Sequence, residues 1–137
     1  MILKLDHIGI AVKNLRQSIR KYEALFNRPP EHVEEVPAQK VRVAMFQAGE
    51  SAIELLEATD SSSPIHTFIE KRGEGIHHLC LRVDDLHRTL DQVREAGFEI
   101  IEQADDRGAG GSRVAFLHPR STGGVLIELV EKMHGKP

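Results

Sequence analysis

The chain has 137 residues, of which 40% are hydrophobic and 28% are charged, and its formal net charge is -3. This length fits one compact domain or two very small ones, and the balanced charge, without a Lys/Arg-rich run, argues against nucleic-acid binding. No apolar run reaches the roughly 20 residues that a membrane-crossing helix needs.

Two further features bear on the compartment. The first residues, MILKLDHIGIAV, are too polar and too regularly patterned for a signal peptide. The single cysteine, Cys80, cannot form an internal disulfide, which fits a reducing compartment. We therefore expect a soluble, cytoplasmic protein with no membrane partner.

The first predicted element is a strand, HIGIAV at 7–12, rich in β-branched and apolar residues. A helix follows, with Asn14 as its expected N-cap and an apolar stripe at helical spacing. The stripe consists of Leu15, Ile19, Tyr22, Leu25 and Phe26. Three strands are then predicted near 33–36, 41–48 and 52–58, which completes a βαβββ module.

A linker at 61–74 carries signals for a short helix of its own, with Ser63 as cap, Pro64 in the first turn and Gly73 at the end. The second module then repeats the order of the first. It has a strand, HLCLRV at 78–83, and a helix that Asp85 caps and Gly97 ends. Its last three strands are predicted near 98–103, 112–118 and 124–131.

The two modules are copies of one unit. A shift of 71 residues places His7 on His78 and Asn14 on Asp85, and it places RVAMF at 42–46 on RVAFL at 113–117. After an insertion of three residues, IELLE at 53–57 matches IELVE at 127–131. We predict a single domain over 1–137, with modules at about 1–60 and 72–132.

Strand alternation predicts where the polar residues of each copy point. In the first strand, Ile8, Ile10 and Val12 share the face that packs under the helix, and His7 shares the other face with two small residues, which predicts an open surface. The same alternation places His78 and Cys80 on that face of the second copy. Glu54 and Glu128 point to the same faces from the last strands. Each module therefore offers one imidazole and one carboxylate.

Two imidazoles and two carboxylates that converge would suit a divalent cation. The predicted ligands are His7, Glu54, His78 and Glu128. His77 matches Asp6 and is expected against the helix layer or solvent, and Cys80 is expected to be a small wall residue. The other histidines lie in polar or loop contexts and are expected at the surface, namely His32, His66, His87 and His134.

Three stretches and the spacing between them resemble the methylmalonyl-CoA epimerase family of the vicinal oxygen chelate superfamily. The stretches are LDHIGIAVKNL, DSSSPIHTFIEKRGEGIHHLCLRVDDL and GAGGSRVAFLHPRSTGGVLIEL. The resemblance implies an α+β fold of two tandem βαβββ modules that form a curved mixed sheet with a concave metal site. It also implies His7, His78 and Glu128 as metal ligands, with Glu54 at the fourth position.

The same resemblance implies an isomerase that interconverts (2R)- and (2S)-methylmalonyl-CoA by removing the α-proton through a metal-stabilised enolate. The implied cofactor is Co²⁺, with Mn²⁺, Ni²⁺ or Zn²⁺ as alternatives, and the implied partners are a CoA thioester and a second copy in a homodimer. Glu128 is the candidate base, and the second base is unassigned because Val43 stands where some relatives carry a glutamate.

Two glycine-rich loops are candidates for substrate contact. The loop at 107–113 contains Gly111, Ser112 and Arg113, and it is expected either to form an anion nest, with Arg107 or Arg113 on a phosphate, or to be a plain β-turn. The loop at 118–124 either covers the thioester, with His118 in contact, or forms a hairpin turn. A glyoxalase I-like isomerase and a metal-free small-molecule-binding protein remain the alternative functions.

Overall fold

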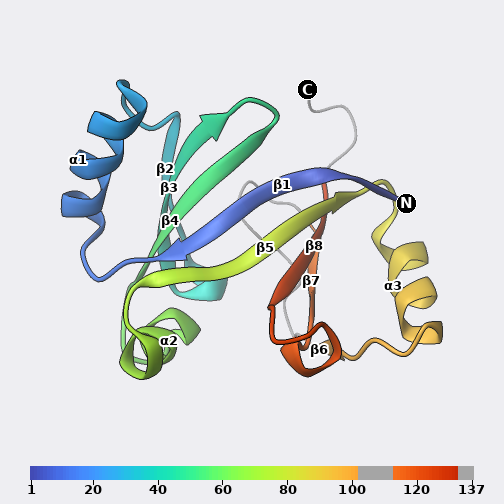
Figure 1. Ribbon diagram of the computed structural model, residues 1–137. Coiled ribbons are helices and arrows are strands. Elements are labelled where there is room, and N and C mark those ends of the chain that lie inside the picture. The colour runs from blue at the N-terminus through green and yellow to red at the C-terminus, as the bar shows by residue number, and fades with distance from the viewer. Residues whose placement is uncertain (102–112, 133–137) are drawn as a thin grey trace. The chain divides into compact units, whose positions relative to one another are not determined.

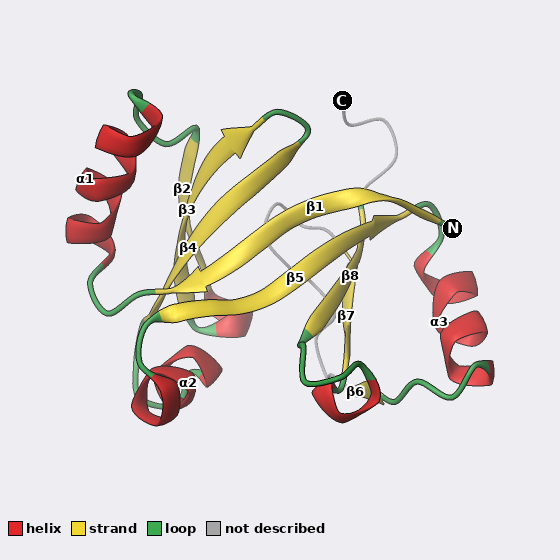
Figure 2. Ribbon diagram, in the orientation of Figure 1, coloured by secondary structure: helices red, strands yellow, loops and turns green. Residues whose placement is uncertain are grey.

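The computed structural model describes residues 1–101 and 113–132 of the chain, which form an α+β fold (Figure 1). Helices and strands alternate along the chain in the expected order, with strand, helix and three strands occurring twice (Figure 2). The first half contains β1 (Ile2–Ala11), α1 (Leu15–Phe26), β2 (His32–Val36), the 3-10 helix η1 (Pro37–Gln39), β3 (Val41–Ala48), β4 (Ser51–Ala58) and α2 (Pro64–Arg72). The second half contains β5 (Gly75–Val83), α3 (Leu86–Glu95), β6 (Ile100–Ile101), β7 (Arg113–Leu117), the 3-10 helix η3 (Pro119–Ser121) and β8 (Ile127–Glu131). Within the described residues, every helix is too short or too polar to cross a membrane.

The chain divides into two compact units, and the division falls inside two strands. One unit is His7–His77, which we call the first-repeat unit. The other joins Met1–Asp6 to His78–Pro137, and we call it the second-repeat unit. Strands β1 and β5 therefore each contribute to both units.

In the first-repeat unit the strands are hydrogen-bonded in the order β2-β3-β4-β1. The β1/β4 pair is parallel and the other two pairs are antiparallel. Helix α1 packs against β3 and β4 through a core built around Phe46, which is 0% exposed (Figure 1). The rings of Phe26 and Tyr22 lie 5.1 and 6.0 Å from the Phe46 ring.

The second-repeat unit has the equivalent order, β5-β8-β7-β6, with β5/β8 parallel and the rest antiparallel. Helix α3 packs against β7 and β8 over a core that includes Val83, Leu117 and Leu129. The pairing registers agree between the repeats, because Gly9 lies opposite Glu54 and its equivalent Cys80 lies opposite Glu128. The two modules therefore share their pairing register as well as their sequence pattern.

The helix caps match the predictions and show one further shared contact. The Asn14 side chain accepts a hydrogen bond from the Gln17 N–H, and Asp85 accepts one from the Arg88 N–H. In addition, Glu57 accepts from the first helical N–H of α1, and its equivalent Glu131 accepts from that of α3. Each last strand therefore supplies a carboxylate to the N-terminus of its own helix.

The linker helix α2 begins and ends as predicted. The Ser63 side chain accepts a hydrogen bond from the Ile65 N–H, Pro64 occupies the first turn, and Gly73 closes the helix at φ +77°. Helix α3 ends before Gly97, whose φ of +98° is in the region that glycine adopts without steric cost.

Three expectations require correction. Leu25 is 74% exposed, because it lies about 80° around the helix from Leu15 and therefore off the apolar stripe. The face of His7, Gly9 and Ala11 is buried rather than open. The last strand begins at Ile127 instead of 124, because 119–124 folds into η3 and a turn in which the Gly124 N–H bonds to the Pro119 carbonyl.

Candidate metal centre

The first-repeat unit brings His7 and Glu54 together. His7 is in β1 and Glu54 is in the parallel neighbour β4, opposite Gly9, which is two residues further along the His7 face. The His7 Nδ1 and Glu54 Oε2 atoms lie 3.4 Å apart, and the two side chains are 8% and 14% exposed. The predicted imidazole and carboxylate of this module are therefore adjacent and largely buried.

The second-repeat unit forms the equivalent pair from His78 on β5 and Glu128 on β8. The His78 Nε2 and Glu128 Oε1 atoms lie 3.1 Å apart, and the side chains are 7% and 9% exposed. Glu128 is opposite Cys80, two residues along the His78 face, which reproduces the geometry of the first module. Both modules thus present one imidazole–carboxylate pair at the same place in the fold.

The residue that flanks each glutamate differs between the repeats. Met45 is the register partner of Glu54, and its equivalent Phe116 is the register partner of Glu128. The Phe116 ring meets the His78 ring edge-on, with centroids 6.3 Å apart and planes at 83°. This aromatic contact restricts the orientation of the His78 ring, and sequence reasoning had not identified it.

The donor atoms of each pair suit a divalent cation. A carboxylate is costly to bury unless a cation or hydrogen-bond donor compensates its charge. Neutral imidazole nitrogens and carboxylate oxygens are ligands that Co²⁺, Mn²⁺, Ni²⁺ and Zn²⁺ all accept. The two pairs therefore have the chemistry that a metal of this class requires.

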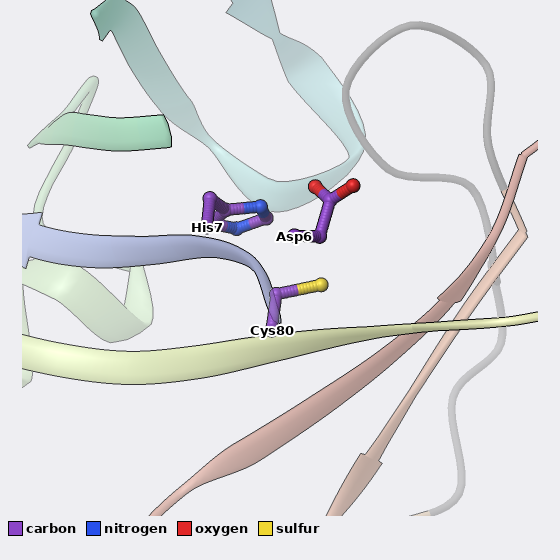
Figure 3. A group of neighbouring side chains, drawn as sticks. All are labelled: Asp6, His7 and Cys80. Atoms are coloured by element: carbon purple, nitrogen blue, oxygen red, sulfur yellow. The ribbon is translucent and has the colours of Figure 1, made fainter. Parts of the chain in front are cut away.

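Asp6, to which the sequence had assigned no role, is a buried carboxylate of the second-repeat unit and is 8% exposed. The Arg82 guanidinium lies 3.0 Å from its Oδ1 atom and the Lys132 Nζ atom 3.8 Å from its Oδ2 atom, so two cations compensate its charge. Figure 3 shows the Asp6 side chain near that of Cys80 of β5, which belongs to the same unit. The signal that could have identified Asp6 is an acidic residue next to a predicted ligand within an apolar strand.

Cys80 is a packing residue, as predicted, although its surroundings are closed and not open. It is a free thiol, 0% exposed, and packs with Val114 and Val130.

The remaining predicted residues are placed as follows. His77 meets Phe68 of α2 edge-on at 5.0 Å, which confirms the helix layer as its neighbour. His32 and His87 are exposed as predicted, whereas His66 is partly buried. Gly111, Ser112 and Arg107, with the rest of 102–112, and His134 lie outside the described residues.

Two candidates for substrate contact are described. Arg113 is exposed at the start of β7, opposite Glu131. His118 caps η3, and its Nδ1 atom accepts a hydrogen bond from the Arg120 N–H at 3.1 Å. The 118–124 segment forms a turn between β7 and β8, with Gly123 and Gly124 at positive φ, as the hairpin-turn alternative expects.

Val43 lies on the Glu54 face of its sheet. Its register partner Leu56 is two residues from Glu54, and Val43 is 3% exposed. The side chain carries no titratable atom, so it cannot transfer a proton at this position.

Comparison with known proteins agrees with this fold. The model of the Glyoxalase/Bleomycin resistance protein/Dioxygenase superfamily matches residues 6–116. The chain is 41% identical over 128 residues to the uncharacterised protein YqjC of Bacillus subtilis, covering 93% of this chain and 91% of YqjC. It is 34% identical over 131 residues to an ethylmalonyl-CoA/methylmalonyl-CoA epimerase of Cereibacter sphaeroides, covering 94% of this chain and 98% of that enzyme.

A solved structure extends the similarity to the whole chain. A variant of Streptomyces coelicolor methylmalonyl-CoA epimerase, in complex with 2-nitronate-propionyl-CoA, superimposes with a TM-score of 0.93 at 33% identity. The match covers 100% of this chain and 99% of that chain. With its two βαβββ modules, the chain therefore belongs to the Glyoxalase/Bleomycin resistance protein/Dioxygenase superfamily and has the vicinal oxygen chelate fold.

Proposed function

We propose that the protein is a metal-dependent epimerase that interconverts (2R)- and (2S)-methylmalonyl-CoA. The observation that carries the proposal is the pair of buried imidazole–carboxylate contacts, His7–Glu54 and His78–Glu128, at equivalent positions of the two repeats. Similarity to enzymes that act on methylmalonyl-CoA, over nearly the full chain, supports the choice of substrate.

We assign His7, Glu54, His78 and Glu128 as the residues that hold one divalent cation, with Co²⁺ as the expected ion and Mn²⁺, Ni²⁺ or Zn²⁺ as alternatives. Each repeat contributes one nitrogen and one oxygen ligand, and the cation would balance the two carboxylates. When bound, it supplies positive charge that stabilises the enolate formed from the substrate thioester.

We assign the first proton step to the Glu128 carboxylate. In one direction, the Glu128 carboxylate takes the α-proton and becomes a neutral acid, while the electron pair of the C–H bond moves onto the thioester. A second group on the opposite face then returns a proton to the α-carbon, which inverts the centre. Glu54 is less buried than Glu128 and lies further from its histidine, which makes it the first residue to test for this second role.

Proton exchange tests the proposal directly. Methylmalonyl-CoA is incubated with the protein in deuterated water, with Co²⁺ present, and loss of the α-proton signal is followed by NMR. We expect exchange that depends on protein and on metal and that EDTA abolishes. If the α-proton signal is lost no faster than in the protein-free control, the epimerase proposal is wrong.

The family to which the chain belongs also includes glyoxalases, which favours one alternative, a glyoxalase I-like isomerase. This enzyme would convert a hemithioacetal into a thioester, so appearance of the thioester absorbance separates the two activities. A metal-free small-molecule-binding protein would show neither activity and would retain no stoichiometric metal after gentle purification. Exchange with ethylmalonyl-CoA then measures how strictly the site selects the methyl substituent.

We also propose that the protein is a homodimer, as its resemblance to the epimerases implies. Size-exclusion chromatography with light scattering measures the mass directly. A mass equal to one chain of 15.3 kDa at micromolar concentration would contradict a stable dimer.

A further inference from the structure

A groove of about 810 Å³ lies along the first half of α1 in the first-repeat unit. Side chains of α1 and its cap form one wall, and two residues of β3 and β4 form the other. The lining residues are Asn14, Leu15, Arg16, Ile19, Arg20, Glu23, Arg42 and Glu57. The volume is in the range that accommodates a nucleotide-sized molecule.

Two arginines of this groove have no partner among the described residues. The guanidinium groups of Arg16 and Arg20 are exposed and make no hydrogen bond or ion pair with any of them. They are four residues apart on α1 and therefore lie on the same helix face, where their like charges repel each other. An anion between them would remove this repulsion.

The two carboxylates of the groove do not neutralise the positive charge of Arg16 and Arg20. Glu57 is held by the Arg42 guanidinium at 3.0 Å and by the Leu15 N–H at 3.3 Å. Glu23 lies on α1 beyond Arg20, at the end of the groove away from Arg16. The Arg16 end therefore carries the excess of positive charge.

The second repeat provides an internal comparison for these positions. His87 stands at the position of Arg16, and Asp91 stands at the position of Arg20. Asp91 pairs there with His87 at 3.7 Å and with Arg94 at 3.3 Å. Asp91 on α3 therefore has partners within its own helix, whereas the two equivalent arginines of α1 have none among the described residues.

The groove is separate from the His7–Glu54 pair. Its β-strand residues Arg42 and Glu57 are register partners, and Glu57 is an odd number of residues from Glu54, so the two glutamates point to opposite faces of β4. A ligand in the groove would therefore lie on the α1 side of the sheet, away from the carboxylate of the metal pair.

We propose that this groove binds the phosphate groups of a nucleotide-sized anion, with Arg16 and Arg20 as the phosphate-binding residues. Paired guanidinium groups bind phosphate oxygens with fixed, often bidentate geometry, which suits a diphosphate better than a single carboxylate. Either a free nucleoside diphosphate or the diphosphate of a coenzyme A molecule carries this chemistry.

Isothermal titration calorimetry with ADP and with inorganic diphosphate tests the site, and adenosine serves as the neutral control. For the wild-type protein at low salt we expect saturable binding of both phosphate probes and none of adenosine. The double variant Arg16→Gln/Arg20→Gln should bind ADP about tenfold more weakly or not at all, because two charge-assisted contacts are lost.

The matched control is Arg88→Gln, which removes one positive charge from an exposed position of α3 whose side chain has no partner among the described residues. It should leave ADP binding unchanged. The proposal is overturned if the wild-type protein shows no saturable binding up to about 10 mM ADP, or if the control weakens binding as much as the double variant does.

The source of the ligand is separated by a second measurement. The KM for methylmalonyl-CoA is compared between wild type and the double variant. An unchanged KM identifies the ligand as a free nucleotide, and a raised KM identifies it as the diphosphate of the substrate. ADP binding does not require epimerase activity, so failure of the proposed reaction leaves this test intact.

Discussion

The two repeats place the same imidazole–carboxylate pair at the same place in the fold, but the distance within the pair and the residue beside it differ. In the second repeat the His78 and Glu128 atoms are 3.1 Å apart, and the Phe116 ring packs edge-on against the histidine. In the first repeat the His7 and Glu54 atoms are 3.4 Å apart, and Met45 takes the place of the aromatic ring. The two repeats therefore share the backbone register, while the side chains around each pair differ. The second pair has the more restrained geometry, and the first has the more accessible carboxylate.

The largest expected effect separates the two glutamates. Replacing Glu128 with glutamine removes the candidate base and should lower the rate of α-proton exchange by about 10²–10⁴-fold. The equivalent change, Glu54→Gln, should cost less, because Glu54 is more exposed and lies further from its histidine. NMR in deuterated water measures both rates, and Glu35→Gln at an exposed position is the control. An equal or greater loss in Glu54→Gln would reverse the assignment.

The next comparison concerns the two cores. Phe46→Ala should reduce the free energy of unfolding by about 3–5 kcal/mol, because Phe46 is 0% exposed and contacts two aromatic rings. The equivalent residue Leu117 is 4% exposed, and Leu117→Ala should reduce the free energy of unfolding by about 2–5 kcal/mol. Urea denaturation measures both, and the exposed Val33→Ala should stay within about 0.5 kcal/mol of wild type. A larger loss for Leu117→Ala would place the tighter core in the second repeat.

Replacing the helix caps should change the free energy of unfolding by less. Asn14→Ala and Asp85→Ala should each cost about 0.5–2 kcal/mol, since each leaves a helical N–H without its acceptor. The loss should be greater for Asp85, whose charge also interacts favourably with the helix dipole. For the same reason Asn14→Asp should stabilise the protein by about 0.3–1 kcal/mol. Urea denaturation at low salt is the measurement, and destabilisation by Asn14→Asp would contradict the dipole argument.

The smallest expected effect is a pH dependence at the surface. Hydrogen bonds from Arg120 lower the pKa of Glu99 below its usual value of 4.5. The unfolded chain then binds the proton more readily, so this contribution to stability is present above pH 4.5 and is lost as the pH falls below it. In the first repeat the pKa of Glu31 is lowered chiefly by the Gln47 N–H. Arg120→Gln should therefore raise the pKa of Glu99 and leave that of Glu31 unchanged, as measured by NMR titration of the carboxyl groups. An unaltered Glu99 pKa would contradict the contact.

Most of the fold could be predicted, because its signals are local or repeated. The caps at Asn14, Ser63 and Asp85 depend on short-range hydrogen bonds, and the strands at 41–48 and 51–58 depend on alternation. The exposed Leu25 and the buried face of His7, Gly9 and Ala11 could not be predicted from pattern alone, because burial depends on which elements pack over a residue. The chemical types at the candidate site were predicted, since the repeat marked His7, Glu54, His78 and Glu128.

The sequence by itself determined two βαβββ modules and the positions in each strand that carry an imidazole or a carboxylate, because strand alternation and an internal repeat need only local information. Only the tertiary structure decided the contacts that cross between strands. It placed Glu54 at 3.4 Å from His7, set the Phe116 ring against His78, and neutralised Asp6 with Arg82 and Lys132. These contacts depend on pairing register and side-chain direction between segments that are distant in the chain, and no local pattern encodes them.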